Sequence, residues 1–338
     1  MERRLSCNRR LVFRRKASDA LNPEHVTNLT EICSMKNSIL RFLTFLISVT
    51  SFGQKQAESN NTLLWQISGN GLQRPSYLFG TIHMLCKDDA VLSDSLKKAI
   101  SNCNEVYLEV DMDNLFEIMN LMTHLRMRND TTLADLMSKE DYTKVKNFFE
   151  QKGGMLPFSM LETYKPFLAV STLQESAVPC ESAVAMEQLI VDEAKKNRKD
   201  IKGLETMAYQ AGIFDSIPYK IQADQLIQYV DSASVENNSE SKEFRELSDA
   251  YKSQNLDKLE ELSNKSDISL TNFSDLLLYN RNHNWVEKLK TLMPSKSLLI
   301  AVGAGHLPGQ KGVINLLRKA GYVVKPVKNI MINAVREI

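Results

Sequence analysis

The segment at residues 297–302 reads Ser-Leu-Leu-Ile-Ala-Val and carries no charge, which strongly restricts the fold. A short apolar run of this kind predicts a strand that is buried on both faces, as in a parallel sheet covered by helices. Further strands are predicted at residues 63–67, 76–80, 105–110, 200–205 and 322–327. Their alternation with helical patterns predicts an α/β fold with a central mixed or parallel sheet flanked by helices.

The first two strands are separated by Gly69-Asn70-Gly71, so we expect them to pair as a hairpin. Helical periodicity predicts a helix behind a cap at Ser93 or Asp94. It also predicts helices over residues 115–149 (with a break near Asn129-Asp130), 159–175, 181–198, 206–230, 241–264, 271–292 and 313–320. We therefore expect one α/β domain over residues 54–338, with a helical insertion at about residues 206–292.

The N-terminal region has the pattern of an export signal. Residues 39–49 are mostly apolar, follow Lys36, and precede small residues that end at Gly53-Gln54. This order predicts a signal peptide, hence export to the periplasm, the outer surface or the medium. The stretch is too short for a membrane span, which needs about 20 apolar residues, so no stable span is expected after cleavage. A buried core helix is the alternative interpretation.

Residues 1–53 are accordingly interpreted as leader and signal peptide. Met35 lies directly before the basic start of the signal, so we interpret it as the start of translation, with residues 1–34 not translated. The alternative is a long basic leader before the same signal.

Charge and cysteine content exclude several kinds of site. The chain has 42 basic and 41 acidic residues, a net charge of +1, which argues against a nucleic-acid-binding surface. After residue 53 only Cys86, Cys103 and Cys180 remain, and no Cys-x-x-Cys pair occurs among them. At most one disulfide and a free thiol are expected, and the sequence leaves the pairing open.

Polar side chains with catalytic potential follow the predicted strands. Two Gly-x-x-His turns occur, Gly80-Thr81-Ile82-His83 and Gly303-Ala304-Gly305-His306, and Glu109 and Asp111 lie at or just past the end of the strand that contains Tyr107-Leu108. Ligands of open α/β sheets bind at the carboxyl ends of the strands. Two imidazoles and a carboxylate would form a three-ligand metal site with an open position, as a hydrolytic site requires. The alternatives are structural histidines at strand ends and, for Glu109 and Asp111, capping or surface carboxylates, which is the interpretation we favour for Asp111.

Five short motifs occur in order over about residues 61–328: Tyr77-Leu78-Phe79-Gly80-Thr81-Ile82-His83-Met84, Leu108-Glu109-Val110-Asp111, Ile201-Lys202-Gly203-Leu204-Glu205-Thr206, Arg281-Asn282-x-x-Trp285 and Val302-Gly303-Ala304-Gly305-His306-Leu307-Pro308-Gly309. Together they resemble the TraB/GumN-like family, in particular its Tiki-type metalloproteases and exported bacterial GumN-like proteins.

The resemblance implies a fold similar to erythromycin-esterase and haem-binding ChaN-type proteins. It implies metal ligation by His83, Glu109 and His306, and catalytic roles for Glu109, Glu205, Arg281 and Asn282. One departure concerns the helix after the Pro-rich loop: many members begin it with Gly-Met-Asp, whereas this chain has Ala185-Met186-Glu187.

Two functions follow from the resemblance. The first is a metal-dependent hydrolase, peptidase-like or esterase-like, that uses Mn²⁺, Co²⁺ or Zn²⁺ and acts on a peptide or small-molecule substrate. The alternative is a peptide- or ligand-binding regulator that uses the same pocket without turnover. No His-Glu-x-x-His motif is present, so the first rests on the resemblance. Substrate, native metal and oligomeric state stay open.

Overall fold

The computed structural model describes residues 61–152, 156–176, 178–235, 239–265 and 272–331. The chain divides into Met1–Ser59 and Asn60–Ile338, and the described residues all belong to the second unit. The leader, the signal peptide and the start at Met35 lie outside them, so those interpretations stay predictions.

A six-stranded mixed sheet forms the centre, as the sequence predicted, in the order β6-β4-β7-β2-β1-β8. Its strands are β1 (Leu64–Ser68), β2 (Ser76–Thr81), β4 (Glu105–Leu108), β6 (Asp200–Gly203), β7 (Leu298–Gly303) and β8 (Val323–Pro326). The neighbours β6, β4, β7 and β2 are parallel, whereas β1 is antiparallel to both β2 and β8. The predicted hairpin is thus confirmed as β1 and β2.

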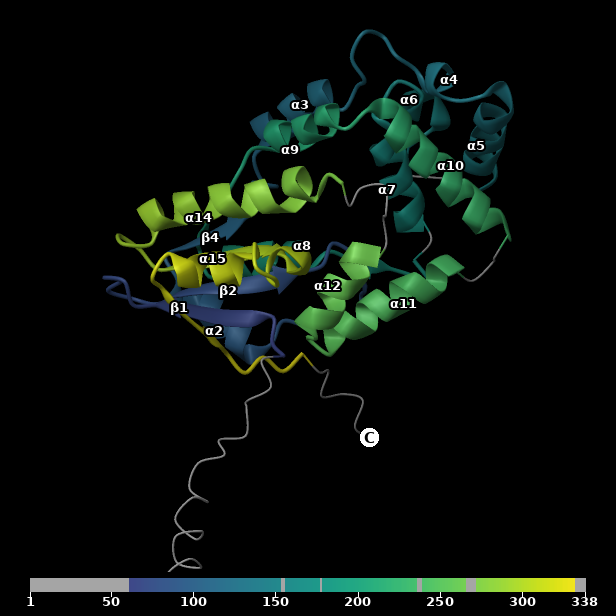
Figure 1. The fold of residues 1–338 in the computed structure, drawn as a ribbon. Helices are drawn as coiled ribbons and strands as arrows, with labels where there is room; N and C mark the ends of the chain where they lie inside the picture. Colours follow the sequence, from purple (N-terminus) through teal and green to yellow (C-terminus); the bar gives the residue numbers. More distant parts are fainter. Residues whose placement is uncertain (1–60, 153–155, 177, 236–238, 266–271, 332–338) are drawn as a thin grey trace, which may run out of the picture. The chain divides into compact units, whose positions relative to one another are not determined.

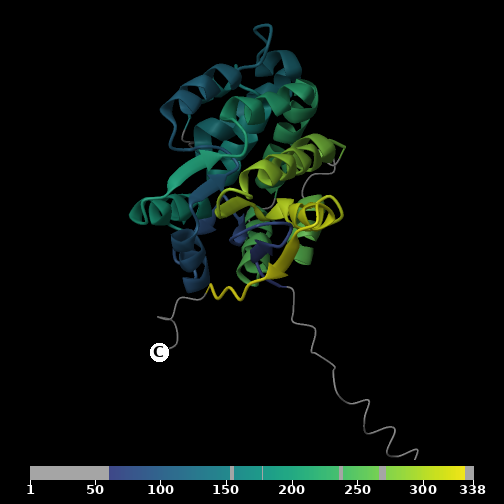
Figure 2. The same cartoon turned by 90° about the vertical axis from the view of Figure 1, so that its left-hand side faces the viewer.

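Helices cover both faces of this sheet, which explains the apolar run in β7: its first five residues are fully buried. On one face lie α2 (Asp94–Asn102) and α8 (Met186–Lys196), and on the other α14 (Asn280–Leu292) and α15 (Val313–Lys319) (Figures 1 and 2). The predicted α/β class, with a central sheet flanked by helices, is confirmed. The similarity to ChaN-type folds stays a prediction.

Helix α2 illustrates how local sequence sets an element. Ser93 is its N-cap, and the Ser93 side chain accepts a hydrogen bond of 3.0 Å from the Leu96 N–H, one of the donors that a helix start leaves unpaired. Leu96, Ala99 and Ile100 then face the core at helical spacing. The sequence predicted this helix, with its cap at Ser93 or Asp94.

A second apolar core lies among helices apart from the sheet. It joins α4 (Leu133–Leu136), α5 (Lys139–Lys152), α6 (Phe158–Leu161) and α7 (Pro166–Ser176) to α10 (Tyr219–Val235), the group at the upper right of Figure 1. The helical region therefore combines residues from before and after β6, because α10 packs on α7 and α5.

The predicted helix over residues 159–175 is interrupted between α6 and α7, and Pro166 begins α7, a position where its missing N–H costs no bond. The predicted helix from residue 181 instead starts with a short strand, β5 (Ala183–Val184), paired antiparallel with β3 (Leu85–Cys86).

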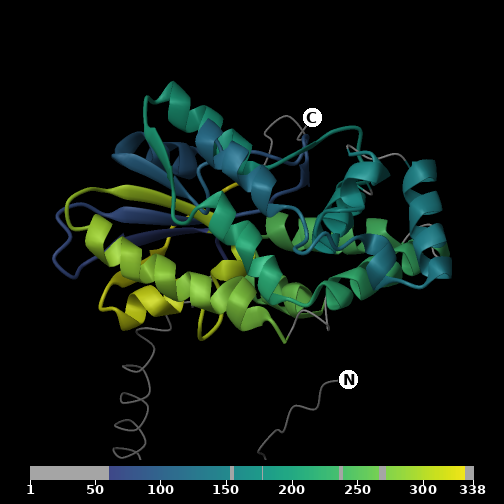
Figure 3. The same ribbon diagram turned by 90° about the horizontal axis from the view of Figure 1, so that it is seen from above.

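Four further helical segments complete the fold: α3 (Leu115–His124), α9 (Met207–Ile213), α11 (Ser239–Lys252) and α12 (Leu256–Lys265). Figures 1 and 3 show α3 beside α9, and α14 running along the sheet. A π-helical turn, η2 (Asp275–Tyr279), leads into α14. Within the described ranges, none of the helices has the length and apolar character that crossing a bilayer requires.

Candidate functional site

The predicted site residues follow four neighbouring parallel strands at one edge of the sheet. His83 lies two residues after β2, Glu109 follows β4, and Glu205 lies two residues after β6. His306 ends a short 3-10 turn, η3 (Ala304–His306), directly after β7. Because all four strands run in the same direction, these side chains meet at the carboxyl edge, as the sequence predicted.

Backbone pairing continues past β4 and β6 and fixes the two carboxylates. The Glu205 N–H donates to the Glu109 carbonyl at 2.9 Å, and the Leu204 N–H donates to the Leu108 carbonyl at 2.8 Å. A Cβ at Gly203 would lie 2.6 Å from the Glu205 carbonyl oxygen, so only glycine permits this approach. The Gly-Leu-Glu sequence therefore holds Glu205 against Glu109.

Arg281 is buried, with 7% of its surface exposed, and ties the two carboxylates together. Its Nη2 donates to Glu109 Oε2 and, at 2.6 Å, to Glu205 Oε1, and its Nε donates to Glu205 Oε1 at 2.9 Å. Its Nη1 contacts the Leu277 carbonyl at 2.9 Å and His306 Nε2 at 3.3 Å. A guanidinium has five N–H donors, and the protein uses all five.

Glu109 is held as a carboxylate by this arrangement. Burial alone would raise its pKa, but a protonated His306, the Arg281 guanidinium and the Gly303 N–H, which donates to Oε1 at 2.8 Å, lower it to about 2. Burial lowers the pKa of His306 itself to about 4, so His306 is neutral at pH 7. At neutral pH we therefore attribute the ionised state of Glu109 to Arg281 and Gly303.

The pKa values of Glu205 and Arg281 are both shifted in this buried cluster. Burial raises the pKa of Glu205 against the opposing hydrogen bonds from Arg281 and from Trp285 Nε1, which donates to Oε2 at 3.0 Å. Burial would also lower the pKa of Arg281, yet the two carboxylates outweigh it and raise that pKa. The cluster is thus a buried guanidinium shared by two acids.

Asn282 fixes the tautomer of His306. Asn282 Nδ2 donates to the Lys311 carbonyl at 2.9 Å, which turns its Oδ1 toward His306 Nδ1 at 2.6 Å. The oxygen can only accept, so Nδ1 carries the proton and Nε2 keeps a lone pair. That lone pair faces Arg281 Nη1 and lies 3.7 Å from Glu109 Oε1.

His83 differs from His306 in its exposure and in its partner. Its side chain is 74% exposed, and its Nδ1 lies 2.9 Å from Oε1 of Glu187, in the first turn of α8. This pairing raises the pKa of His83 to about 9. Burial opposes ionisation of Glu187, but the pairing with His83 outweighs burial and lowers the pKa of the acid. His83 also interacts electrostatically with Glu109 and Arg281, which links the two parts of the edge.

Three contributors were not predicted as site residues: Glu187, Trp285 and Gln210. Trp285 packs against the His306 ring with centroids 4.5 Å apart, and Gln210 Nε2 donates to Glu109 Oε2 at 3.1 Å. Trp285 lies one helical turn after Arg281, and Glu187 is the acid in the Ala-Met-Glu departure, so both had a signal in the sequence. No sequence signal marks Gln210.

The remaining candidates lie outside this cluster. Asp111 is partly exposed and accepts a hydrogen bond from the Asp113 N–H, the surface role considered for it. Cys86 and Cys180 form a disulfide, whereas Cys103 is a buried free thiol. The bridge joins the segment after His83 to the segment before Glu187.

The donors at the edge differ in how well they fit a divalent cation. Around Glu109 and His306 they fit poorly, because Arg281 already occupies the lone pair of His306 and would repel a cation there. Around His83 they fit, since the ring is exposed and both Glu187 oxygens are buried without a well-formed hydrogen bond from any described residue. In the parts of the chain that the structure describes, no three His, Cys, Asp or Glu side chains are clustered closely enough to hold a metal.

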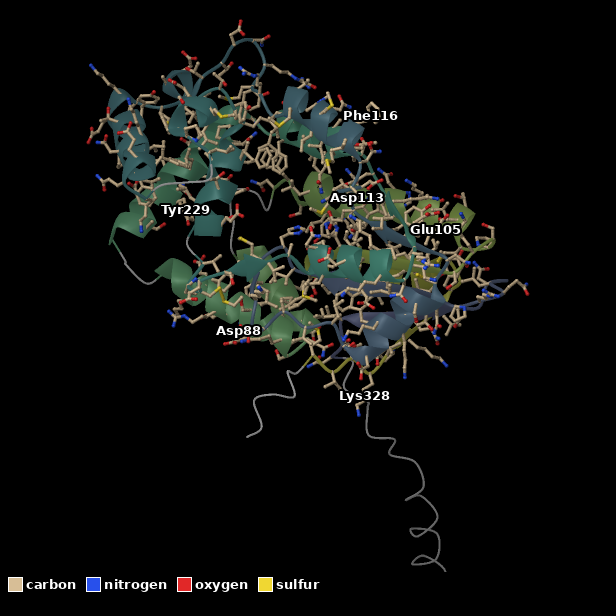
Figure 4. All side chains as sticks on the ribbon, turned by 180° about the vertical axis from the view of Figure 1, so that it is seen from behind. Asp88, Glu105, Asp113, Phe116, Tyr229 and Lys328 are labelled. Atoms are coloured by element: carbon tan, nitrogen blue, oxygen red, sulfur yellow. A yellow bond between two sulfur atoms is a disulfide. The ribbon has the colours of Figure 1, made fainter. Side chains whose placement is uncertain are left out.

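A cleft and an apolar surface lie beside the site. The cleft has a volume of about 490 Å³ and is lined by residues that include Tyr209, Leu276 and Asn280, next to Gln210 and Arg281 in the sequence. Helix α3 packs on α9 yet has no buried residue, and its Phe116 is 83% exposed (Figure 4). Exposed apolar side chains on or next to α3 are Met112, Leu115, Phe116, Ile118, Met119 and Met122.

Comparison with known proteins agrees with this architecture. Residues 63–326 match the sequence model of the TraB/PrgY/gumN family. The chain is 23% identical over 314 residues to Metalloprotease TIKI2 of Danio rerio, covering 78% of this chain and 61% of that protein. It is 22% identical over 325 residues to Metalloprotease TIKI1 of Homo sapiens, covering 80% of this chain and 63% of that protein.

A bacterial relative is covered more fully. The Uncharacterized protein YbaP of Shigella flexneri is 23% identical over 261 residues, covering 72% of this chain and 88% of that protein. By contrast, the chain spans 61% and 63% of the length of the two TIKI proteins, less than two thirds of either. No solved structure matches the chain.

Proposed function

The chain belongs to the TraB/PrgY/gumN family, and we propose on that premise that it is a hydrolase of peptide or ester bonds. The observation that carries the proposal is the pairing of an exposed imidazole, His83, with a buried carboxylate at the edge where the Glu109–Arg281 cluster lies. The relatives named metalloproteases support the same class of reaction.

We propose further that the reaction depends on a divalent cation, Mn²⁺, Co²⁺ or Zn²⁺. Three carboxylates, those of Glu109, Glu187 and Glu205, lie at this edge with two basic groups, the Arg281 guanidinium and the His83 imidazole, and a cation could replace the proton that Glu187 holds on His83. His83 is the predicted ligand that best fits the ion, because solvent reaches its ring. A cation bound there would act as a Lewis acid toward a substrate carbonyl. Ligand roles for Glu109 and His306 remain predictions.

The chain's own residues divide into two groups in this scheme. His83 is the part of the site that a substrate can reach. Glu109, Glu205 and Arg281 form a buried cluster of charged side chains held by mutual hydrogen bonds. These side chains therefore keep their orientation as charge develops on the substrate. Arg281 has no spare N–H, and we therefore assign it a positioning role.

Turnover assays test this proposal. Purified protein would be treated with a chelator and incubated with a peptide library and a set of esters, without metal and with Mn²⁺, Co²⁺ or Zn²⁺. We expect cleavage only after metal is restored, and its loss in His83→Ala. Cleavage by the chelated protein, or by metal-loaded His83→Ala, at the rate of metal-loaded wild type would exclude the proposed chemistry.

A second function, binding of a peptide without turnover, is favoured by the exposed apolar side chains of α3 beside the 490 Å³ cleft. Methionine-rich apolar surfaces adapt to varied partners. The same peptide library distinguishes the two functions: a regulator would retain intact peptides, and Phe116→Ser would weaken their retention.

A further inference from the structure

We propose that Glu187 and His83 form a divalent-cation site. The two Glu187 oxygens and a His83 ring nitrogen would be its donors, with the Thr81 hydroxyl as a further oxygen. The inference rests on the proposed function in one respect, since it names the residues that would hold the hydrolase's metal. Glu187 was not among the predicted ligands, and nothing in the comparisons assigns it a role.

The fold connects the His83 segment rigidly to the start of α8. The Met186 N–H donates to the Ile82 carbonyl at 3.1 Å, and β3 pairs with β5 through Leu85 and Val184. The Cys86–Cys180 disulfide closes the same pair of segments. Backbone and covalent bonds therefore hold Glu187 beside His83, and the site depends on no mobile side chain from elsewhere.

The buried oxygens of this site lack well-formed hydrogen bonds to any residue that the structure describes, although Glu187 Oε1 is ion-paired with His83 at 2.9 Å. Glu187 is 7% exposed and Thr81 is 1% exposed. Among the described residues, neither Glu187 oxygen nor Thr81 Oγ1 has a hydrogen bond of normal geometry, although the Thr81 hydroxyl is near enough to help lower the pKa of Glu187. More than nine in ten buried polar groups of folded proteins have such a partner. A bound cation would satisfy all three oxygens together.

The His83–Glu187 distance also suits two ligands of one ion. Nδ1 and Oε1 are 2.9 Å apart and form an ion pair. Two ligands of a tetrahedral zinc ion, each at about 2.0 Å, lie roughly 3.3 Å apart. The two atoms would need to separate by only a few tenths of an ångström.

The exposure of the His83 side chain suits a catalytic metal site. A catalytic metal site keeps one position open to water or substrate, whereas a structural site is closed. The His83 side chain is 74% exposed, while the carboxylate beneath it is buried. A cation held between them would thus be covered by protein on one side and accessible on the other.

Calorimetry on the full chain tests the site without any assay of activity. Chelator-treated wild type, Glu187→Gln, His83→Ala and Glu193→Gln would each be titrated with Zn²⁺ and with Mn²⁺. Glu193 is a matched control, because it lies on the same helix but pairs with Asn197 away from His83. We expect one ion bound by wild type and by Glu193→Gln, and an affinity at least about 10-fold weaker in Glu187→Gln and His83→Ala.

Two results would overturn the site: no ion bound by wild type, or equal affinity in wild type and Glu187→Gln. Circular dichroism and thermal melts establish that each variant is folded, and Glu187→Asp, which keeps the charge, should restore part of the affinity. The site and the hydrolase proposal fail separately. Metal binding through Glu187 without turnover leaves the site standing, whereas metal-dependent turnover with unchanged binding in Glu187→Gln leaves only the hydrolase.

Discussion

His306 donates its Nδ1 proton to Asn282 Oδ1 over 2.6 Å, and both side chains are almost completely buried. Replacing Asn282 by alanine leaves that N–H and the Lys311 carbonyl without their partner. A buried polar group without a hydrogen bond costs about 1–3 kcal/mol. We expect Asn282→Ala to lower the free energy of unfolding by that amount in urea denaturation.

The exposed Asn284 on the same helix is the control, since Asn284→Ala should leave stability almost unchanged. Nitrogen NMR of the imidazole would show the Nδ1–H tautomer in wild type and a mixture of tautomers in Asn282→Ala. A variant as stable as wild type, with the tautomer unchanged, would contradict the proposed role of Asn282.

His306 should make the metal-free protein acid-sensitive. Burial lowers its pKa from 6.5 to about 4 in the folded state, although Glu109 opposes this shift and Arg281 and His83 support it. The folded state favours the neutral ring, so its contribution is complete above pH 6.5 and is lost as the pH falls toward 4. We expect a loss of up to about 3 kcal/mol in unfolding free energy over this window.

Urea denaturation at pH 7, 5.5 and 4, in chelator, measures this slope, and His306→Gln should flatten it. The pKa of His83 is shifted the other way, to about 9, so its contribution grows by less than about 1 kcal/mol between pH 7 and 5.5 and is constant below that. Because His83 is present in both proteins, the comparison with His306→Gln cancels this contribution. An identical slope in His306→Gln would assign the acid sensitivity to other groups.

Gly80 allows β2 to approach the turn after β7. A Cβ at this position would lie 3.1 Å from both Cα and Cβ of Ala304, where the backbone has little freedom to move. Overpacking of this kind costs about 1–3 kcal/mol, so Gly80→Ala should melt at a lower temperature than wild type.

Gly212, near the end of α9, is the opposite case, because a Cβ added there would meet no atom within 4 Å. Since alanine favours a helix more than glycine does, Gly212→Ala should be neutral or stabilising. If both variants melt alike, close packing at Gly80 is not the cause.

The Cys86–Cys180 disulfide should contribute strongly to stability, because it closes a separation of 94 residues. Chain-entropy arguments give roughly 4–5 kcal/mol for a loop of this length. Dithiothreitol should therefore lower the denaturation midpoint of wild type and have no effect on the double variant Cys86→Ser, Cys180→Ser. Equal midpoints for the oxidised wild type and this variant would show that the bridge adds nothing.

The sequence predicted the elements of the sheet well, because local patterns decide them. The apolar run before Gly303 could only be a buried strand, and the cap at Ser93 marks a helix start by its own chemistry. Strand direction then brought His83, Glu109, Glu205 and His306 to one edge without any knowledge of side-chain contacts.

What the sequence could not show are contacts that depend on packing between distant segments. Nothing local distinguishes Arg281 with all its donors used from an arginine that is free to bind substrate. Gln210 donates to Glu109 across a separation of 101 residues, which no local pattern predicts. The pairing of Cys86 with Cys180, and with it the approach of Glu187 to His83, required the three-dimensional path of the chain.

The strand order has a consequence for how the protein is made. β2 and β4 are synthesised early but are never neighbours, because β7, near the end of the chain, lies between them. A chain emerging from the ribosome therefore holds both early strands without their shared partner until about residue 303 has appeared. His83 and Glu109 can join a finished site only after β7 has been synthesised, so products truncated before β7 should lack the assembled site.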